Sequence, residues 1–258
     1  MMHIPIIITA FGTTTTARQT YALFDQQVRA AFPSHEIFWA YSSRLVRDFA
    51  HQRHSMILKA PKEVLVDLQQ QGHEWGVVQS LHLIGGHEFY RLVEEVRQCQ
   101  IRTSMGLPLL SSPADYVAFM EAVADTFAPI QDDEALILVG HGTDHPSWST
   151  YLAVQYLLQK RFGANIHVGV IEGTPARAEI LETVARSGIK RVRLVPLMLV
   201  AGVHIQEDLA GPEDSWKTAF EEEGFPVTVD STGLLYCSGI IEIFLKHIDA
   251  ALAVIPDQ

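Results

Sequence analysis

The sequence has few cysteines, no excess of positive charge and no long apolar run. Its two cysteines, Cys99 and Cys237, lie far apart and form no CxxC pair, so neither a disulfide framework nor a cysteine zinc site is expected. With 19 basic and 30 acidic residues the net charge is -11, which argues against nonspecific binding to nucleic acid or to an anionic membrane. No apolar run approaches the roughly 18 residues that span a bilayer, and no secretory signal is visible. We therefore expect a cytoplasmic protein without nucleic-acid or membrane partners.

Three catalytic motifs are also missing. The chain contains no GxxxxGK and no GxGxxG, so a nucleotide cofactor is not expected. The absence of GxSxG leaves a serine hydrolase without support.

What the sequence does contain is a regular alternation of short apolar runs and helical patterns. Apolar, β-branched runs predict strands that are buried on both faces. The predicted strands are 4–10, 36–41, 76–84, 135–139, 166–171, 191–200 and 227–230. Strands that alternate with helices of about 10 to 15 residues are typical of βαβ units, and hence of an α/β fold with parallel sheets.

The alternation occurs twice, which predicts two similar lobes. Residues 101–113 contain a glycine and two prolines with weak periodicity, and are interpreted as a linker. We predict an N-terminal lobe at 1–112 and a C-terminal lobe at 113–258, each a parallel β-sheet flanked by helices, with a cleft between them. This prediction is also compatible with a C-terminal helix that packs against the first lobe.

One residue that can bind a metal follows each of three strands in the second lobe. His141, Glu172 and His204 are separated by 31 and 32 residues, about one strand-helix unit each. Because the carboxyl ends of parallel strands meet at one edge, we expect the three side chains to converge there. Each residue alone has an ordinary structural explanation, a hydrogen-bonded histidine or a helix N-terminus. Together, two imidazoles and a carboxylate predict a site for a borderline divalent ion.

The first lobe has the same layout with different residues. Phe11 and Ser43 follow its first two strands, and Glu88 aligns with His204 when HLIGGHEF is placed over MLVAGVHI. We interpret this as a duplication, with an insertion near 44–57. Across a cleft Glu88 would face His204, either as an extra ligand or as a proton acceptor.

Several further polar residues have two interpretations. Thr13 and Thr14 either cap the first helix or donate hydrogen bonds to a ligand. His51 and His54 share a helix face but have no third ligand nearby, which favours a solvated face. His82 lies inside a predicted strand and is interpreted as a core-facing or sheet-capping histidine.

The ordered phrases of this chain resemble those of a known family. IIITAFGTT, AYSSR, SLHLIGGHEF, ILVGHGT, GVIEGTP and VPLMLVAGVHIQEDLAG occur in the order and spacing of the anaerobic cobalt chelatases of cobalamin biosynthesis, the sirohydrochlorin cobaltochelatases. These are class II, ATP-independent chelatases, lyases related in fold to ferrochelatase. The resemblance covers about residues 4–250.

The resemblance implies insertion of Co(II) into sirohydrochlorin, a tetrapyrrole, with release of two protons. The histidines of the family fall on His141 and His204, and its acidic positions fall on Glu88 and Glu172. We accordingly expect His141, Glu172 and His204 to bind the metal, and His141, His204 and Glu88 to be catalytic.

Sirohydrochlorin carries many carboxylates, so an acidic protein needs a locally basic site for it. Five arginines lie near the relevant strand ends, namely Arg18, Arg44, Arg47, Arg53 and Arg177. The residues expected to bind the substrate are Phe11, Thr13, Thr14, Ser43, Arg44 and Glu88.

Alternatives remain open at this point. Iron insertion for sirohaem is one, with Fe(II) or Ni(II) in place of Co(II). A non-catalytic carrier of metal or tetrapyrrole is another, and it would share the ligands without needing a proton acceptor. The sequence is also compatible with a homo-oligomer.

Overall fold

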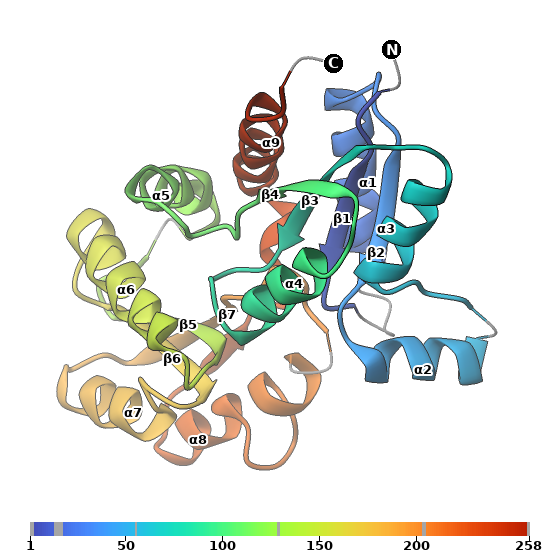
Figure 1. Ribbon diagram of the computed structural model, residues 1–258. Coiled ribbons are helices and arrows are strands. Elements are labelled where there is room, and N and C mark those ends of the chain that lie inside the picture. The colour runs from blue at the N-terminus through green and yellow to red at the C-terminus, as the bar shows by residue number, and fades with distance from the viewer. Residues whose placement is uncertain (1–2, 13–17, 55, 128–129, 203–204, 257–258) are drawn as a thin grey trace. The chain divides into compact units, whose positions relative to one another are not determined.

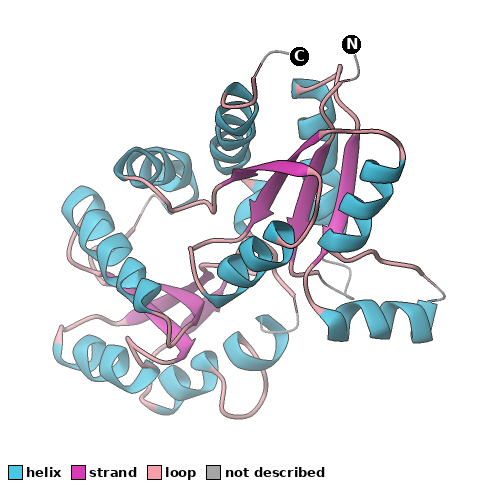
Figure 2. Ribbon diagram, in the orientation of Figure 1, coloured by secondary structure: helices cyan, strands magenta, loops and turns pink. Residues whose placement is uncertain are grey.

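The computed structural model describes residues 3–12, 18–54, 56–127, 130–202 and 205–256. It divides into two compact units, one formed by Met1–Asp115 with Ser238–Gln258 and the other by Tyr116–Cys237. Each unit contains one parallel sheet of four strands flanked by helices (Figures 1 and 2). The predicted α/β architecture is therefore confirmed.

The first unit has the strand order β2-β1-β3-β4. Its strands are β1 (Ile6–Ala10), β2 (Ile37–Tyr41), β3 (Trp75–Leu81) and β4 (Arg102–Gly106). Its helices are α1 (Arg18–Ala31), α2 (Arg44–His54), α3 (Pro61–Gln70), α4 (His87–Arg97) and α9 (Ser238–Ala253). Every residue of β1 is buried, because helices cover both faces of the sheet. Phe24 of α1 meets Phe244 of α9 edge to face at 5.7 Å, while Leu65 of α3 and Leu92 of α4 belong to a cluster around Ile7.

The second unit has the order β6-β5-β7-β8. Its strands are β5 (Glu134–Gly142), β6 (Ile166–Glu172), β7 (Arg191–Pro196) and β8 (Val227–Val229). Its longer helices are α5 (Pro113–Phe127), which begins in the first unit, α6 (Ser149–Phe162), α7 (Arg177–Arg186) and α8 (Trp216–Glu222). Its short helical turns are η1 (Pro146–Trp148), η2 (Ile205–Leu209) and η3 (Leu234–Tyr236).

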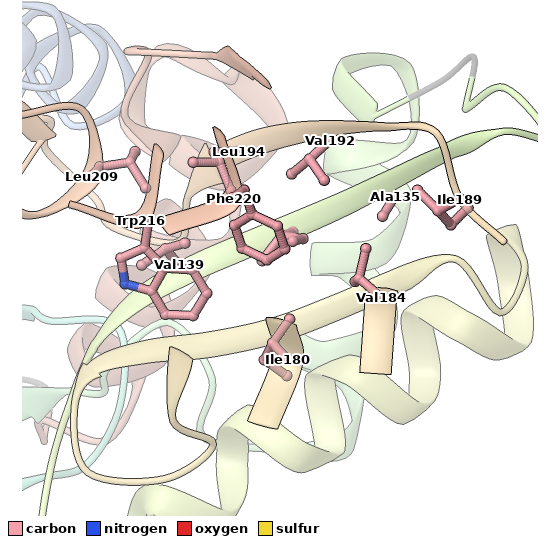
Figure 3. Close-up of a cluster of buried hydrophobic side chains, with 11 residues drawn as sticks. Ala135, Val139, Ile180, Val184, Ile189, Val192, Leu194, Leu209, Trp216 and Phe220 are labelled. Carbon is pink, nitrogen blue, oxygen red and sulfur yellow. The ribbon is translucent and has the colours of Figure 1, made fainter. Parts of the chain in front are cut away.

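A compact hydrophobic cluster joins α7 and α8 to one face of the second sheet (Figure 3). Ile137 and Val139 contribute from β5, and Trp216 and Phe220 contribute from α8. The Trp216 ring lies so close to Gly169 of β6 that a Cβ atom there would be 2.2 Å from it. This packing joins β5 and β6 next to the edge of the sheet at which His141 and Glu172 lie.

The two units share their sheet order, and in both the central strand leads into a left-handed glycine. Gly12 follows β1 with φ 106°, and Gly142 ends β5 with φ 94°. Among the described elements, α2 has no counterpart in the second unit, where β6 is followed directly by α7. Most of the extra residues predicted near 44–57 therefore belong to α2 (Arg44–His54).

The predicted linker at 101–113 was wrong. Residues Arg102–Gly106 form β4, which pairs in parallel with β3. The strand was missed because it is a short edge strand with only Ser104 and Gly106 buried, so it lacks an apolar run. The two units separate at Asp115, inside the first turn of α5.

Two strands are shorter than predicted, and the chain leaves the sheet earlier in both units. β3 ends at Leu81 and β7 at Pro196, although apolar residues continue beyond them. Beyond each strand, backbone carbonyls bond to segments outside the sheet. The carbonyl of His82 accepts the backbone N–H of Leu109, and the carbonyl of Met198 accepts that of Leu234. Within the described residues, no helix is long and apolar enough to cross a bilayer.

Candidate metal site at the carboxyl edge of the second sheet

His141 lies at the carboxyl end of the central strand of the second sheet. It is the second-last residue of β5, between β6 and β7, and its side chain is exposed. Its Nδ1 atom is 3.3 Å from the carbonyl oxygen of Gly142. A carbonyl oxygen only accepts hydrogen bonds, so in this contact Nδ1 carries the proton. In a neutral ring the lone pair is then on Nε2, the nitrogen through which such an imidazole would bind a metal.

Glu172 lies at the end of the neighbouring strand. It is the last residue of β6, is exposed, and is paired in register with Gly142. A Cβ atom at Gly142 would be 1.8 Å from the backbone oxygen of Glu172. The two strand ends can approach this closely only because residue 142 is a glycine.

The pleat of the sheet limits how His141 and Glu172 can meet. His141 is level with Ile171, which packs against the cluster on the α7 and α8 face. Successive side chains of a strand point to opposite faces, so Glu172 starts from the other face. An ion bound by both residues would therefore lie beyond the strand ends rather than over one face of the sheet.

His204, Thr13 and Thr14 lie outside the residues that the structure describes. No group of three His, Cys, Asp or Glu side chains suited to a metal ion occurs among the described residues. The convergence of His141, Glu172 and His204 therefore remains a prediction. Of the three residues, His141 and Glu172 lie on adjacent strands.

The corresponding positions of the first unit have different environments. Phe11 follows β1 and is 48% exposed. Ser43 is buried, and its hydroxyl accepts a hydrogen bond from the backbone of Val46 at 3.3 Å, as a helix cap does. Glu88 is in the first turn of α4, and its carboxylate pairs with Arg91 at 2.6 Å.

The arginines near the strand ends are mostly engaged within the protein. Arg177 pairs with Asp214 at 2.5 Å, and Arg47 donates to backbone carbonyls at the end of β2. Arg44 is 85% exposed at its side chain and lies 3.5 Å from Asp48. Arg44 and Arg47 line a polar hollow of about 280 Å³ beside α2, but Asp48 and Glu63 line it too. This hollow has no excess of positive charge.

Three other histidines have structural roles. His82 shares a 2.8 Å hydrogen bond with Ser80, and burial lowers its pKa to about 4, so it is neutral. Its Nε2 atom is buried without a partner among the described residues. His145 accepts the backbone N–H of Ser147 and caps η1. Burial also lowers the pKa of His167 in β6.

Tyr151 of α6 was missed by the sequence reasoning. It is 3% exposed, its hydroxyl accepts the backbone N–H of Gly142 at 3.1 Å, and burial raises its pKa. Its ring occupies the space beside Gly140, where a Cβ atom would be 2.5 Å away. The available signal was a tyrosine in the helix after each GT turn, Tyr21 in the first lobe and Tyr151 in the second.

The chain matches one family model and two named relatives over nearly its whole length. The sequence model of the cobalt chelatase (CbiK) family matches residues 5–253. The sirohydrochlorin cobaltochelatase of Salmonella typhimurium is 32% identical over 254 residues, covering 96% of each chain. The sirohydrochlorin cobaltochelatase CbiKC of Nitratidesulfovibrio vulgaris is 33% identical, covering 99% of this chain and 94% of that protein.

Among solved structures, SirB from Bacillus subtilis with Fe3+ has the same fold. It superposes with a TM-score of 0.67 at 15% identity, covering 98% of this chain and 96% of SirB. The match of the family model over nearly the whole sequence goes further than this likeness in fold. The chain belongs to the cobalt chelatase (CbiK) family.

Proposed function

We propose that this protein inserts Co(II) into sirohydrochlorin without hydrolysing a nucleotide. The observation that carries the proposal is the placement of His141 and Glu172 at the carboxyl ends of two adjacent strands. The two full-length relatives are both named sirohydrochlorin cobaltochelatases, which supports the choice of metal and tetrapyrrole.

The expected ligand set suits a metal that must be bound and then released. Imidazole and carboxylate bind borderline divalent ions well, whereas several thiolates would hold the ion too strongly for transfer. His141, Glu172 and His204 would hold Co(II) while leaving other coordination positions for the pyrrole nitrogens. Glu172 supplies one negative charge, which partly offsets that of the ion.

Insertion also requires proton transfer. The macrocycle loses two N–H protons as the divalent ion enters, so the charge of the macrocycle with its metal is unchanged, and a nearby base must take up these protons. His141, His204 and Glu88 are the proposed acceptors. Glu88 is ion-paired with Arg91, so its protonation would have to accompany loss of that contact.

Metal selectivity is left open by the ligands. Affinities of nitrogen and oxygen sites for divalent ions follow a general order, so the same residues accept Fe(II) and Ni(II). A metal-competition assay with Co(II), Fe(II) and Ni(II) on sirohydrochlorin would rank the three by initial rate.

The test of the proposed function is anaerobic conversion of metal-free sirohydrochlorin, followed in the visible spectrum after addition of Co(II). We expect a rate above the background without protein, and a decrease of about 100-fold or more for His141→Ala. A carrier, the second candidate, would bind both partners yet leave the rate at background. Normal rates in His141→Ala would contradict the proposed site.

A further inference from the structure

Gly142 connects the residues that carry the proposed metal site. Its backbone N–H donates to the hydroxyl of Tyr151 at 3.1 Å. Its carbonyl oxygen faces Nδ1 of His141 at 3.3 Å. Its Cα lies against the backbone of Glu172, because a Cβ atom there would be 1.8 Å from that carbonyl oxygen. Any shift of Gly142 therefore changes both His141 and the end of β6.

Tyr151 contacts Gly142 from the interior of the second unit. It comes from α6, on the face of the sheet opposite the α7 and α8 cluster, and is almost fully buried. Gly140 leaves room for its ring, so strand and helix approach closely at this point. Because burial keeps the phenol protonated, its oxygen is a neutral acceptor for the Gly142 N–H. Gly142 has a left-handed φ of 94°, which glycine adopts without strain, so the turn at this position depends on residue 142 being a glycine.

The first unit has the same contact without a histidine. The backbone of Gly12 hydrogen-bonds the hydroxyl of Tyr21 in α1, and Gly12 has φ 106°. The residue before this glycine is Phe11, which cannot bind a metal. The glycine-tyrosine contact therefore stabilises the turn in both units, but only in the second unit does the turn position a metal ligand.

We propose that Tyr151 is a positioning residue for the metal substrate. By holding Gly142, its hydroxyl fixes the carbonyl that orients the His141 ring, with Nε2 as the ligating nitrogen. The same contact sets the separation between His141 and Glu172. This inference rests on the proposed function, since it takes His141 as a metal ligand. Removing partners that orient a ligand typically costs about 10- to 100-fold in metal affinity.

The test compares Tyr151→Phe with Tyr21→Phe as a matched control. Each change removes one hydroxyl and keeps the ring, so each leaves one strand-end N–H without its acceptor. We expect both variants to lower the thermal midpoint by similar amounts. In Co(II) titrations without tetrapyrrole, we expect only Tyr151→Phe to raise the dissociation constant, by about tenfold or more. Only Tyr151→Phe should also change the visible absorption bands of bound Co(II), which report ligand geometry and which a general loss of stability would not move.

The variant His141→Ala distinguishes failure of the role proposed for Tyr151 from failure of the proposed metal site. If His141→Ala abolishes Co(II) binding while Tyr151→Phe matches Tyr21→Phe in affinity and spectrum, the role of Tyr151 is overturned and the proposed function stands. If His141→Ala binds Co(II) normally, the proposed metal site and the role of Tyr151 are both overturned. An altered affinity and spectrum in Tyr151→Phe alone supports the inference.

Discussion

His247 of α9 holds Asp115 at the start of α5. The Nε2 atom of His247 lies 3.0 Å from a carboxylate oxygen of Asp115, and Nδ1 lies 3.0 Å from the carbonyl oxygen of Leu107. Both ring nitrogens therefore face acceptors, which an imidazolium satisfies with two N–H donors. The other oxygen of Asp115 accepts the backbone N–H of Ser112, so this carboxylate also caps α5.

The pKa of Asp115 predicts an acid-dependent loss of stability. Burial raises this pKa, but the hydrogen bonds from His247 and Ser112 outweigh burial, and the net pKa is lowered. A lowered folded-state pKa contributes stability above the ordinary value of about 3.9, and the contribution is lost as the pH falls below it. We expect His247→Ala to reduce the free energy of unfolding by about 2 kcal/mol at pH 7, and by less at pH 3.

Urea unfolding at the two pH values measures this difference. Lys246→Ala, an exposed neighbour on the same helix, is the control and should change stability by less than about 0.5 kcal/mol. Equal losses for His247→Ala at pH 7 and pH 3 would show that the ion pair does not contribute.

His82 predicts a second pH dependence, at higher pH. Its folded-state pKa of about 4 lies below the ordinary value of about 6.5, so the unfolded chain binds the proton more readily. The contribution of His82 to the free energy of unfolding is fully present above about pH 6.5 and declines as the pH falls toward 4. Between pH 7 and pH 5 the decline is at most about 2 kcal/mol, because pH 5 lies only about 1.5 units below the ordinary pKa and His82 is only half-buried.

His82→Leu should remove this dependence. We expect the difference in unfolding free energy between pH 7 and pH 5 to be smaller in the variant than in the parent protein. His51→Leu, which changes an exposed histidine on α2, is the control for replacing a histidine with leucine. An unaltered difference in His82→Leu would assign the pH dependence to other groups.

Gly142 is expected to tolerate no side chain. Gly142→Ala combines a left-handed φ of 94° with a Cβ atom 1.8 Å from the Glu172 oxygen. Gly163→Ala is the matched control, because Gly163 has φ 112° but nothing within 4 Å of its Cβ position. The control should cost about 1 to 3 kcal/mol of stability from backbone strain alone. We expect Gly142→Ala to cost clearly more and to lower Co(II) affinity, as measured by chemical unfolding and by titration.

Glu172 is predicted to contribute charge to metal binding. Glu172→Gln keeps the size of the side chain and removes its negative charge, so the dissociation constant for Co(II) should rise about tenfold or more. Glu179→Gln, an exposed glutamate in the first turn of α7, should bind Co(II) as the parent does. Equal affinities in the two variants would remove Glu172 from the ligand set.

The periodicity of the chain was enough to predict the fold and the strand-end positions of two candidate site residues. His141 and Glu172 could be located because each ends an apolar run, and parallel strands end at one edge of a sheet. The order of strands in a βαβ array then makes β5 and β6 neighbours. These relations depend on the backbone alone.

Features that depend on side-chain packing could not be predicted in this way. β4 is an edge strand in which only two positions need burial, so its sequence looks like a loop. Arg177 was a candidate substrate ligand, but it pairs with Asp214, a loop residue distant in sequence. Tyr151 reaches Gly142 because Gly140 leaves space for its ring. This contact depends on three residues in two elements, so the spacing of apolar residues does not predict it.

The position of α9 has a consequence for the order in which the protein can fold during synthesis. The helix contacts β3, β4 and α1, so the first unit is built from segments at both ends of the chain. Until residues 238–253 leave the ribosome, β3 and β4 lack their contacts with α9, and Phe24 lacks its partner Phe244. The second unit is continuous in sequence and can fold earlier, so the part of the chain made first is completed last.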